Sequence, residues 1–281
     1  MRKAVYLIVL LTITFAGCKQ GNNLMQQLTE IDSIANQKGD SMAYTMLEEI
    51  APENINDEES LAYYWLLRIR TELNLNLKIS SIKPLDHSIQ YYKNTHNKKK
   101  LARVLFYKGN ILNKKGQLQE SVNCLKAVEY LIQNDPEERV LADHLYYLLS
   151  NINYKAKETE LAIEYAKLAL KNSYSNGDHY SITYNLMALY VDYMEMGNKD
   201  SAYYYLSKCI PLLDRIPNNQ RSGFYANIGN AFIETDANKA EEYLNKSIAI
   251  SQNTVRSYRS RIHSAESVRI TDTEEWWKEQ D

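Results

Sequence analysis

The sequence predicts an all-α fold in which helical hairpins stack on one another, and three observations lead to this prediction. From residue 24 onward the apolar residues recur at helical spacing almost throughout, with no convincing two-residue alternation typical of a strand. The 281-residue chain has only nine Gly and five Pro, so tight turns are few and long helices are favoured. Four segments between residues 101 and 252 resemble one another, which indicates a repeated structural unit.

The first 17 residues have the composition of a secretory signal peptide. Arg2 and Lys3 precede the apolar stretch 4–16. Its 13 residues fall short of the roughly 20 that a membrane-spanning helix needs, but they suit the apolar region of a signal peptide. The stretch leads into Phe-Ala-Gly-Cys at residues 15–18, which resembles the lipobox of bacterial lipoproteins, with Phe where Leu is commoner.

This resemblance implies a lipid anchor on Cys18. Signal peptidase II would cut before that residue, and its thiol would carry diacylglycerol with acyl chains such as palmitate. Several acyl chains on one residue hold a protein on a membrane more firmly than a single chain does. Residues 18–23 would then form a leash in a Gram-negative cell envelope, by default on the outer membrane facing the periplasm. An ordinary secretory signal with an incidental cysteine and a single-pass anchor are the alternative interpretations.

The stretch 24–100 predicts two degenerate helical pairs. We expect Asp40-Ser41 and Asp57 to cap the second and third helices, and Pro84 suits the first turn of the fourth. The apolar faces of the four helices are formed, in order, by Leu24, Leu28, Ile31 and Ile34; by Ala43, Leu47 and Ile50; by Leu61, Tyr64, Trp65 and Ile69; and by Leu85, Ile89 and Tyr92.

The stretch 101–252 predicts four further hairpins. Its similar segments read LFYKGNILNKKGQLQESVNCLKAV, YYLLSNINYKAKETELAIEYAKLA, LMALYVDYMEMGNKDSAYYYLSKC and YANIGNAFIETDANKAEEYLNKS. Each segment is predicted to form a helix, a short turn and a second helix. The first three align without gaps, and the fourth aligns with them when its turn is taken as one residue shorter.

Small residues recur at fixed places in these segments. The middle of the first helix has Gly109, Ser150, Tyr190 and Gly229, of which Tyr190 departs from the pattern. The turns contain Gly116, Lys157, Gly197 and Asp236. The second helices have Ser121, Ala162, Ala202 and Ala240, and one turn later Leu125, Ala166, Leu206 and Leu244. Small residues let paired helices approach closely, and large ones fill the groove between neighbours.

This pattern resembles the tetratricopeptide repeat (TPR). The small residues of successive second helices are 41, 40 and 38 positions apart, against 34 in the typical repeat, so we expect lengthened helices. The resemblance implies a right-handed α-solenoid, whose units stack because no single unit can bury its own apolar face. The remaining stretch 253–281 is expected to begin as a capping helix and to end in a frayed tail.

The sequence contains no recognisable enzymatic constellation. Its five His residues are scattered without a paired spacing, and no Gly-x-Gly occurs. The net charge is −2, and the one basic run, NKKK at 97–100, is expected in a solvated loop, so nucleic-acid binding is not indicated. We therefore expect no catalytic residue, no metal site and no cofactor.

The TPR resemblance also implies a concave groove lined by the first helices. The residue after the small position points into such a groove, and it is Asn110, Asn151 and Asn230, with Val191 breaking the series. An Asn side chain offers a donor and an acceptor, so a row of them can hold an extended peptide backbone. The expected flanking residues are Phe106, Asn113, Lys114, Tyr147, Tyr154 and Lys155. The alternative interpretation is that Asn is common here in the family and ties helices together.

Together these features predict a membrane-anchored, non-enzymatic scaffold that binds a peptide or helix of an envelope protein in its groove. Two alternatives stay open. One is a glycan-binding accessory lipoprotein, in which some of the 23 Tyr rings would stack on sugars. The other is the sensor half of a shortened TPR regulator.

Overall fold

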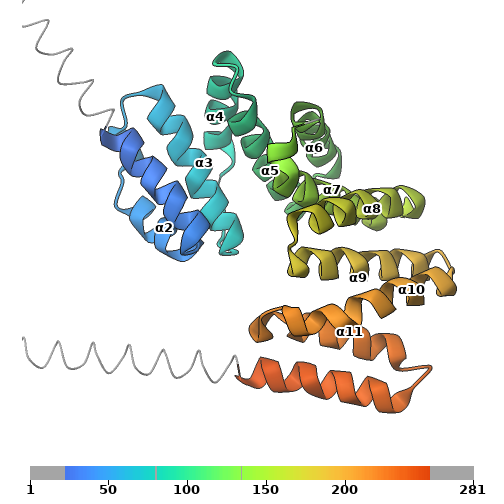
Figure 1. The fold of residues 1–281 in the computed structure, drawn as a ribbon. Coiled ribbons are helices and arrows are strands. Elements are labelled where there is room, and N and C mark those ends of the chain that lie inside the picture. Colours follow the sequence, from blue (N-terminus) through green and yellow to red (C-terminus); the bar gives the residue numbers. More distant parts are fainter. Residues whose placement is uncertain (1–22, 80, 134, 254–281) are drawn as a thin grey trace, which may run out of the picture. The chain divides into compact units, whose positions relative to one another are not determined.

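The computed structural model describes residues 23–79, 81–133 and 135–253, and this part of the chain is helical, without a strand. Within each of its two units, successive helices pack against each other in antiparallel hairpins, which confirms the predicted fold class (Figure 1). The predictions for the signal peptide, for Cys18 and for the C-terminal stretch 254–281 lie outside the described residues. Within those residues, no helix is both long enough and apolar enough to cross a bilayer.

The chain divides between Ala156 and Lys157 into two compact units, each described by itself. The first unit begins with a helix over residues 23–37. It continues with α2 (Asp40–Glu48), the 3₁₀ turn η1 (Pro52–Asn54), α3 (Glu58–Asn74), α4 (Lys83–Asn94), α5 (Lys98–Lys114), α6 (Leu118–Ile132), η2 (Pro136–Glu138) and α7 (Arg139–Lys155). The second contains α8 (Thr159–Asn176), α9 (His179–Glu195), α10 (Lys199–Cys209), η3 (Ile210–Arg215), η4 (Asn218–Gln220) and α11 (Ser222–Phe232). A helix over residues 237–253 ends its described part.

Helix starts follow the sequence signals with two exceptions. The Asp57 side chain caps α3 by accepting a hydrogen bond from the Ser60 backbone N–H at 2.7 Å, and Pro84 lies in the first turn of α4. Asp40 does not cap α2, because the N-cap is Gly39 and Asp40 is already helical. The prediction of a loop at residues 97–100 is also wrong: Asn97 caps α5, and the three lysines form its first turn.

Two of the predicted close-packing glycines lie directly against the second helix of their hairpin. A Cβ added at Gly109 would come within 2.9 Å of a methyl carbon of Leu125. One added at Gly229 would come within 2.7 Å of the Leu244 Cγ and 3.2 Å of the Ala240 carbonyl oxygen. Leu125, Ala240 and Leu244 all belong to the recurring positions of the second helices, so the spacing of small and large residues sets the approach of the helices.

The turns inside the hairpins require a left-handed residue. Gly116 and Gly197 have φ of +77° and +78°. The chain closes each of these helices with a backbone hydrogen bond spanning five residues, from Gln117 to Leu112 at 2.9 Å and from Asn198 to Tyr193 at 2.9 Å. Gly enters this conformation without the steric cost that a Cβ brings.

The turns at Lys157 and near Asp236 depart from this pattern. Lys157 adopts the same left-handed conformation with φ of +67°, which costs a residue with a Cβ roughly 1–2 kcal/mol. The turn near Asp236 has no left-handed residue. There the Asp236 side chain accepts a hydrogen bond from the Lys239 backbone N–H at 3.1 Å and opens the next helix directly. This different closure accounts for the one residue missing from the fourth segment.

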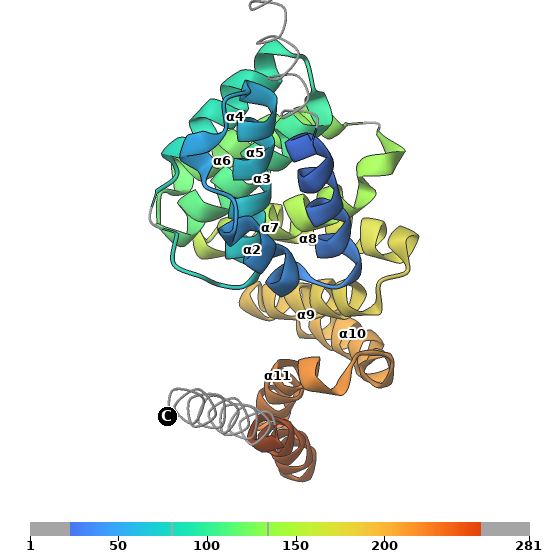
Figure 2. The ribbon, with the colours of Figure 1, turned by 90° about the vertical axis from the view of Figure 1, so that its left-hand side faces the viewer.

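In the first unit, the first helices of consecutive hairpins also contact each other. Besides its contacts with α2 and α4, α3 touches α5, and α5 touches α7 (Figures 1 and 2). The helix over residues 23–37 joins α3 through a 2.7 Å ion pair between Asp32 and Arg70. We call these four helices (residues 23–37, α3, α5 and α7) the first-helix layer, since any groove of the predicted kind must be built on them.

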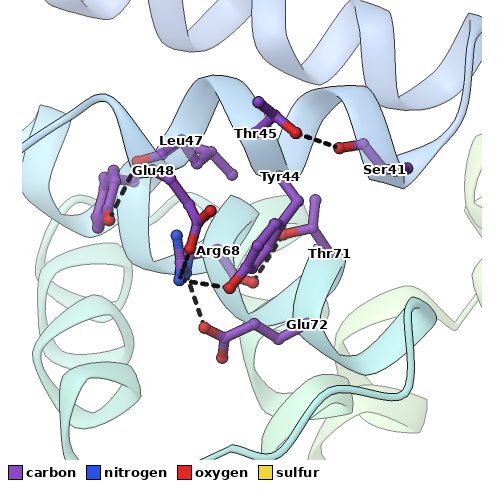
Figure 3. Close-up of polar contacts among 9 residues, drawn as sticks. Ser41, Tyr44, Thr45, Leu47, Glu48, Arg68, Thr71 and Glu72 are labelled. Atoms are coloured by element: carbon purple, nitrogen blue, oxygen red, sulfur yellow. Dashed lines mark hydrogen bonds and ion pairs between the residues drawn. The ribbon is translucent and has the colours of Figure 1, made fainter. Parts of the chain in front are cut away.

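The opposite side of α3 is fixed to α2 by a polar cluster around Arg68 (Figure 3). The Arg68 guanidinium donates to the Tyr44 hydroxyl at 2.9 Å and pairs with Glu72 at 2.7 Å and Glu48 at 3.4 Å. It also lies 4.2 Å from the centre of the Tyr44 ring. Arg68 therefore has a structural role between α2 and α3. Arg70, two residues later, instead pairs with Asp32 in the helix over residues 23–37.

Candidate functional site

The first-helix layer of the first unit contains a polar network across adjacent helices. The Tyr63 hydroxyl donates to one oxygen of Asp32 at 2.6 Å, and the Arg70 guanidinium donates to the other at 2.7 Å. Arg70 also donates to the side chain of Asn36 at 2.8 Å. Asp32 thus joins two side chains of α3 to the helix that precedes it, and this fixes Tyr63 and Arg70 in place.

The N-terminal half of α5 extends this network. The Lys100 amine lies 3.6 Å from the centre of the Tyr63 ring and 5.7 Å from that of Tyr92. Arg103 pairs at 3.2 Å with the buried Glu138, which immediately precedes α7. An ammonium over an aromatic face is attracted by the ring quadrupole. The layer therefore holds three cations (Arg70, Lys100 and Arg103) around Tyr63.

Burial changes the acidity of the groups in this network. Burial raises the pKa of Tyr107 to about 12, while the nearby charges of Arg70 and Arg103 oppose the rise. For Lys100, burial lowers the pKa, and Glu59 and Asp32 act in the opposite direction. Both side chains are half-buried, and electrostatic interactions are stronger there than on an open surface.

The predicted groove asparagines Asn110 and Asn151 lie on α5 and α7 and are half-buried. Each follows a buried small residue, Gly109 or Ser150, as the pattern predicts. Neither amide takes part in a hydrogen bond with another described residue. Their donors and acceptors are therefore available to a ligand, and no contact supports the alternative in which they tie helices together.

The flanking residues occupy different environments. Asn113 is half-buried, with a buried side-chain oxygen that has no hydrogen-bond partner among the described residues. Lys114 is exposed and donates to the Asn76 side chain at 3.4 Å. The buried Phe106 stacks on His144, with ring centres 6.4 Å apart. On α7, Tyr147 and Tyr154 are half-buried and Lys155 is exposed. These placements are compatible with a ligand-facing role, which remains a prediction.

The third asparagine of the series belongs to the second unit. Asn230 is exposed on α11, and Val191 is half-buried on α9. The same two helices bring together three rings that the sequence analysis did not single out: Tyr180 and Tyr184, which are partly exposed, and the buried Phe224, with ring centres 5.6–5.9 Å apart. The four-residue spacing of the two tyrosines was the signal for a shared helix face.

The three cations of the first unit were also missed by the sequence analysis. Arg70, Lys100 and Arg103 come from two helices separated by α4, and their convergence depends on the contact between α3 and α5. A local signal did exist, because the segment around Lys100 and Arg103 contains no Asp or Glu. Among the described residues, no three His, Cys, Asp or Glu side chains are grouped so that they could hold a metal ion.

No protein-family profile and no curated protein matches this sequence significantly. Solved structures do match. A Rap protein complexed with Competence and Sporulation Factor is 15% identical, with a TM-score of 0.61, over 83% of this chain and 66% of that one. The quorum sensor NprR from B. thuringiensis, in its apo form, is 16% identical over 82% and 65%, with a TM-score of 0.56.

A third match, aspartyl phosphate phosphatase F from Bacillus subtilis, is 14% identical over 82% of this chain and 64% of that one, with a TM-score of 0.50. The chain thus spans slightly less than two thirds of each of these proteins. At this level of identity the likeness concerns the fold. This protein is therefore similar in fold to helical-repeat proteins of the TPR-like kind.

Proposed function

We propose that this protein is a lipid-anchored, non-enzymatic TPR-like scaffold that binds a peptide or helix of an envelope protein on its first helices. The observation that carries the proposal is a pair of half-buried side-chain amides, Asn110 and Asn151, at corresponding places on α5 and α7, neither of which has a hydrogen-bond partner among the described residues. An amide side chain can pair with the backbone N–H and C=O of an extended peptide whatever its sequence.

Two of the proteins with a similar fold add support. One is a Rap protein in complex with Competence and Sporulation Factor, and the other is the quorum sensor NprR. Such a fold can therefore present a surface to a signalling ligand. A peptide-binding role fits the polar first-helix layer of this chain, in which Arg70, Lys100, Asn110 and Asn151 gather side chains able to bind polar groups.

Replacing Asn110 and Asn151 together with alanine should reduce partner capture at least fivefold without unfolding the chain, because each change removes an amide that makes no side-chain hydrogen bond to the described residues. The measurement is quantitative recovery of cross-linked partners from detergent-solubilised envelopes. Asn230→Ala, in the second unit, is assayed separately. The matched control is Asn123→Ala, an exposed asparagine on α6. Equal recovery by the double variant and the control would rule out the groove assignment, provided that both melt like the wild type.

The anchor is tested independently of the groove. Cys18→Ala should move the protein from the membrane fraction to the soluble fraction of disrupted cells, because the acyl chains that hold it would no longer be attached. The measurement is the distribution between pellet and supernatant after ultracentrifugation, with Cys124→Ala as the control thiol. A Cys18→Ala variant that stays in the pellet after a high-salt wash would refute the lipid anchor and favour a membrane-spanning leader.

A further inference from the structure

The segment that contains α5 carries charge of one sign only. Between Asp86 and Glu120 the chain has eight Lys or Arg residues and no Asp or Glu, although the whole protein has a net charge of −2. Three of the lysines, Lys98 to Lys100, form the first turn of α5. Cations at a helix N-terminus oppose the helix dipole, at a cost of about 0.3–1 kcal/mol each. Because these lysines destabilise the helix that contains them, the pattern favours a role in binding over a role in folding.

Only some of these charges are neutralised within the protein. Lys108 pairs with Asp86 at 2.7 Å on the side of α5 that faces α4. Lys99 pairs with Glu137, and Arg103 with Glu138. Lys100 and Lys114 have no carboxylate within ion-pair distance in the described part of the chain. Among the described residues, Lys100 and Lys114 therefore have aromatic or amide neighbours instead of counter-ions.

These two lysines lie on one face of α5. Lys100, Arg103, Tyr107, Asn110 and Lys114 follow each other at intervals of three or four residues, which places them along a single stripe of the helix. We call these five residues the α5 stripe. At 1.5 Å per residue, its two terminal lysines are about 21 Å apart along the axis. The stripe includes the groove amide of Asn110.

Contacts on both sides show that the stripe belongs to the first-helix layer. Lys100 touches Tyr63 of α3, and Lys114 donates to Asn76 just after α3. On the other side Arg103 reaches Glu138, at the start of α7. Lys100 is half-buried, and a partly desolvated ammonium without a counter-ion attracts a carboxylate more strongly than a fully hydrated one does.

We propose that the α5 stripe selects an acidic peptide segment: Lys100 and Arg103 bind one carboxylate, Asn110 binds the peptide backbone, and Lys114 binds a second carboxylate. This inference rests on the proposed peptide-binding function and names the chemistry of its ligand. An extended chain advances about 3.3 Å per residue, so acidic residues about six positions apart would match the two lysines. A peptide is favoured over a phosphate backbone or an anionic membrane, because the Asn110 amide lies between the two lysines and offers both a donor and an acceptor to a peptide backbone.

The test uses the purified full chain in detergent, immobilised through a C-terminal tag. The probe is a library of twelve-residue peptides with random small polar residues and glutamate at positions 3 and 9, mixed with an equal library that has glutamine there. We expect at least tenfold enrichment of the glutamate peptides, falling when NaCl is raised from 50 to 500 mM. Lys100→Met combined with Lys114→Met should abolish the enrichment, and Lys100→Arg combined with Lys114→Arg should retain at least half of it.

The matched control is Lys98→Met combined with Lys115→Met, which removes the same charge from the two ends of the same segment but off the stripe, and should keep the enrichment. Equal losses in both methionine variants would overturn the proposal, since only net charge would then matter. So would binding of anionic vesicles or single-stranded DNA that depends on Lys100 and Lys114 without any glutamate preference. If partners cross-link at Asn110 but glutamate gives no enrichment, the acidic assignment fails while the scaffold function stands; if cross-linking also fails, the proposed function fails.

Discussion

Replacing Asp192 with asparagine should remove a loss of stability that the wild-type second unit undergoes between about pH 4 and pH 7. Asp192 lies on α9 with 3% of its surface exposed, and one of its carboxylate oxygens has no hydrogen-bond partner among the described residues. The corresponding positions of α5 and α7 are the buried Ile111 and Ile152. A carboxyl group therefore occupies a place that the repeat reserves for an apolar side chain, and burial raises its pKa to about 7.

The direction of the effect follows from proton linkage. Between the ordinary pKa near 4 and the raised value near 7, the folded chain keeps the proton of Asp192 and the unfolded chain releases it. The folded state then binds more protons, so the free energy of unfolding falls as the pH rises through this range. The stabilisation is complete below about pH 4 and lost above about pH 7, and the difference amounts to about 4 kcal/mol.

The measurement is urea denaturation of the full chain at several pH values, followed by tyrosine fluorescence. Asp192→Asn should be more stable than the wild type above pH 7 and should lack most of the fall between pH 4 and pH 7. Asp200→Asn, an exposed aspartate in the first turn of α10, provides the control and should leave the fall unchanged. An identical pH dependence in the wild type and Asp192→Asn would show that Asp192 is solvated in solution.

The second large effect is expected at Gly229. Alanine there would place its Cβ 2.7 Å from the Leu244 Cγ and 3.2 Å from the Ala240 carbonyl oxygen, which belongs to the backbone of the facing helix and has little room to move. Overpacking of this kind costs about 1–3 kcal/mol. The higher helix propensity of alanine offsets up to about 1 kcal/mol of this cost. We expect Gly229→Ala to lower the free energy of unfolding by about 1–2 kcal/mol.

The same helix offers a matched control. Gly223 also lies in α11, but a Cβ there would meet no heavy atom within 4 Å. Gly223→Ala should therefore keep the propensity gain without the clash and stabilise the chain slightly. Thermal unfolding of the two variants measures the difference, which we expect to be about 2 kcal/mol. If Gly229→Ala were as stable as Gly223→Ala, the close approach of α11 to residues 237–253 would be wrong.

The repeat pattern predicted correctly those features that depend only on residues close together in the sequence. Gly109 and Gly229 could be placed against Leu125 and Leu244 because a hairpin brings together residues at fixed separations in the sequence. The caps at Asp57 and the proline start of α4 were predicted for the same reason, since each depends on the next three or four residues. The position of Asn110 on its helix also follows from its neighbour Gly109.

Predictions were wrong or incomplete in two situations. Either two local signals for a helix start competed, or the contacting residue lies far away in the sequence. The lysines at 97–100 look like a solvated loop by composition, yet Asn97 caps a helix that begins with them. Asp40 resembles a cap, but it already belongs to the helix, and the N-cap is Gly39 with φ of +98°, a conformation that glycine adopts without steric cost. The repeat alignment places Asp192 where Ile111 and Ile152 stand in the other segments, which is a signal for burial, but it does not tell which groups surround the carboxylate.

By itself the sequence determined that this protein is a stack of helical hairpins, where the small residues and turns lie, and which face of each first helix carries the asparagines. These features depend on periodicity, which is a local property of the chain. Only the tertiary structure decided that Lys100 would lie over Tyr63, that Arg70 would be held by Asp32, and that one oxygen of Asp192 would have no hydrogen-bond partner among the described residues. Those environments arise where helices from different hairpins meet, because the charges and the burial that a side chain experiences are set by the residues of the neighbouring helices.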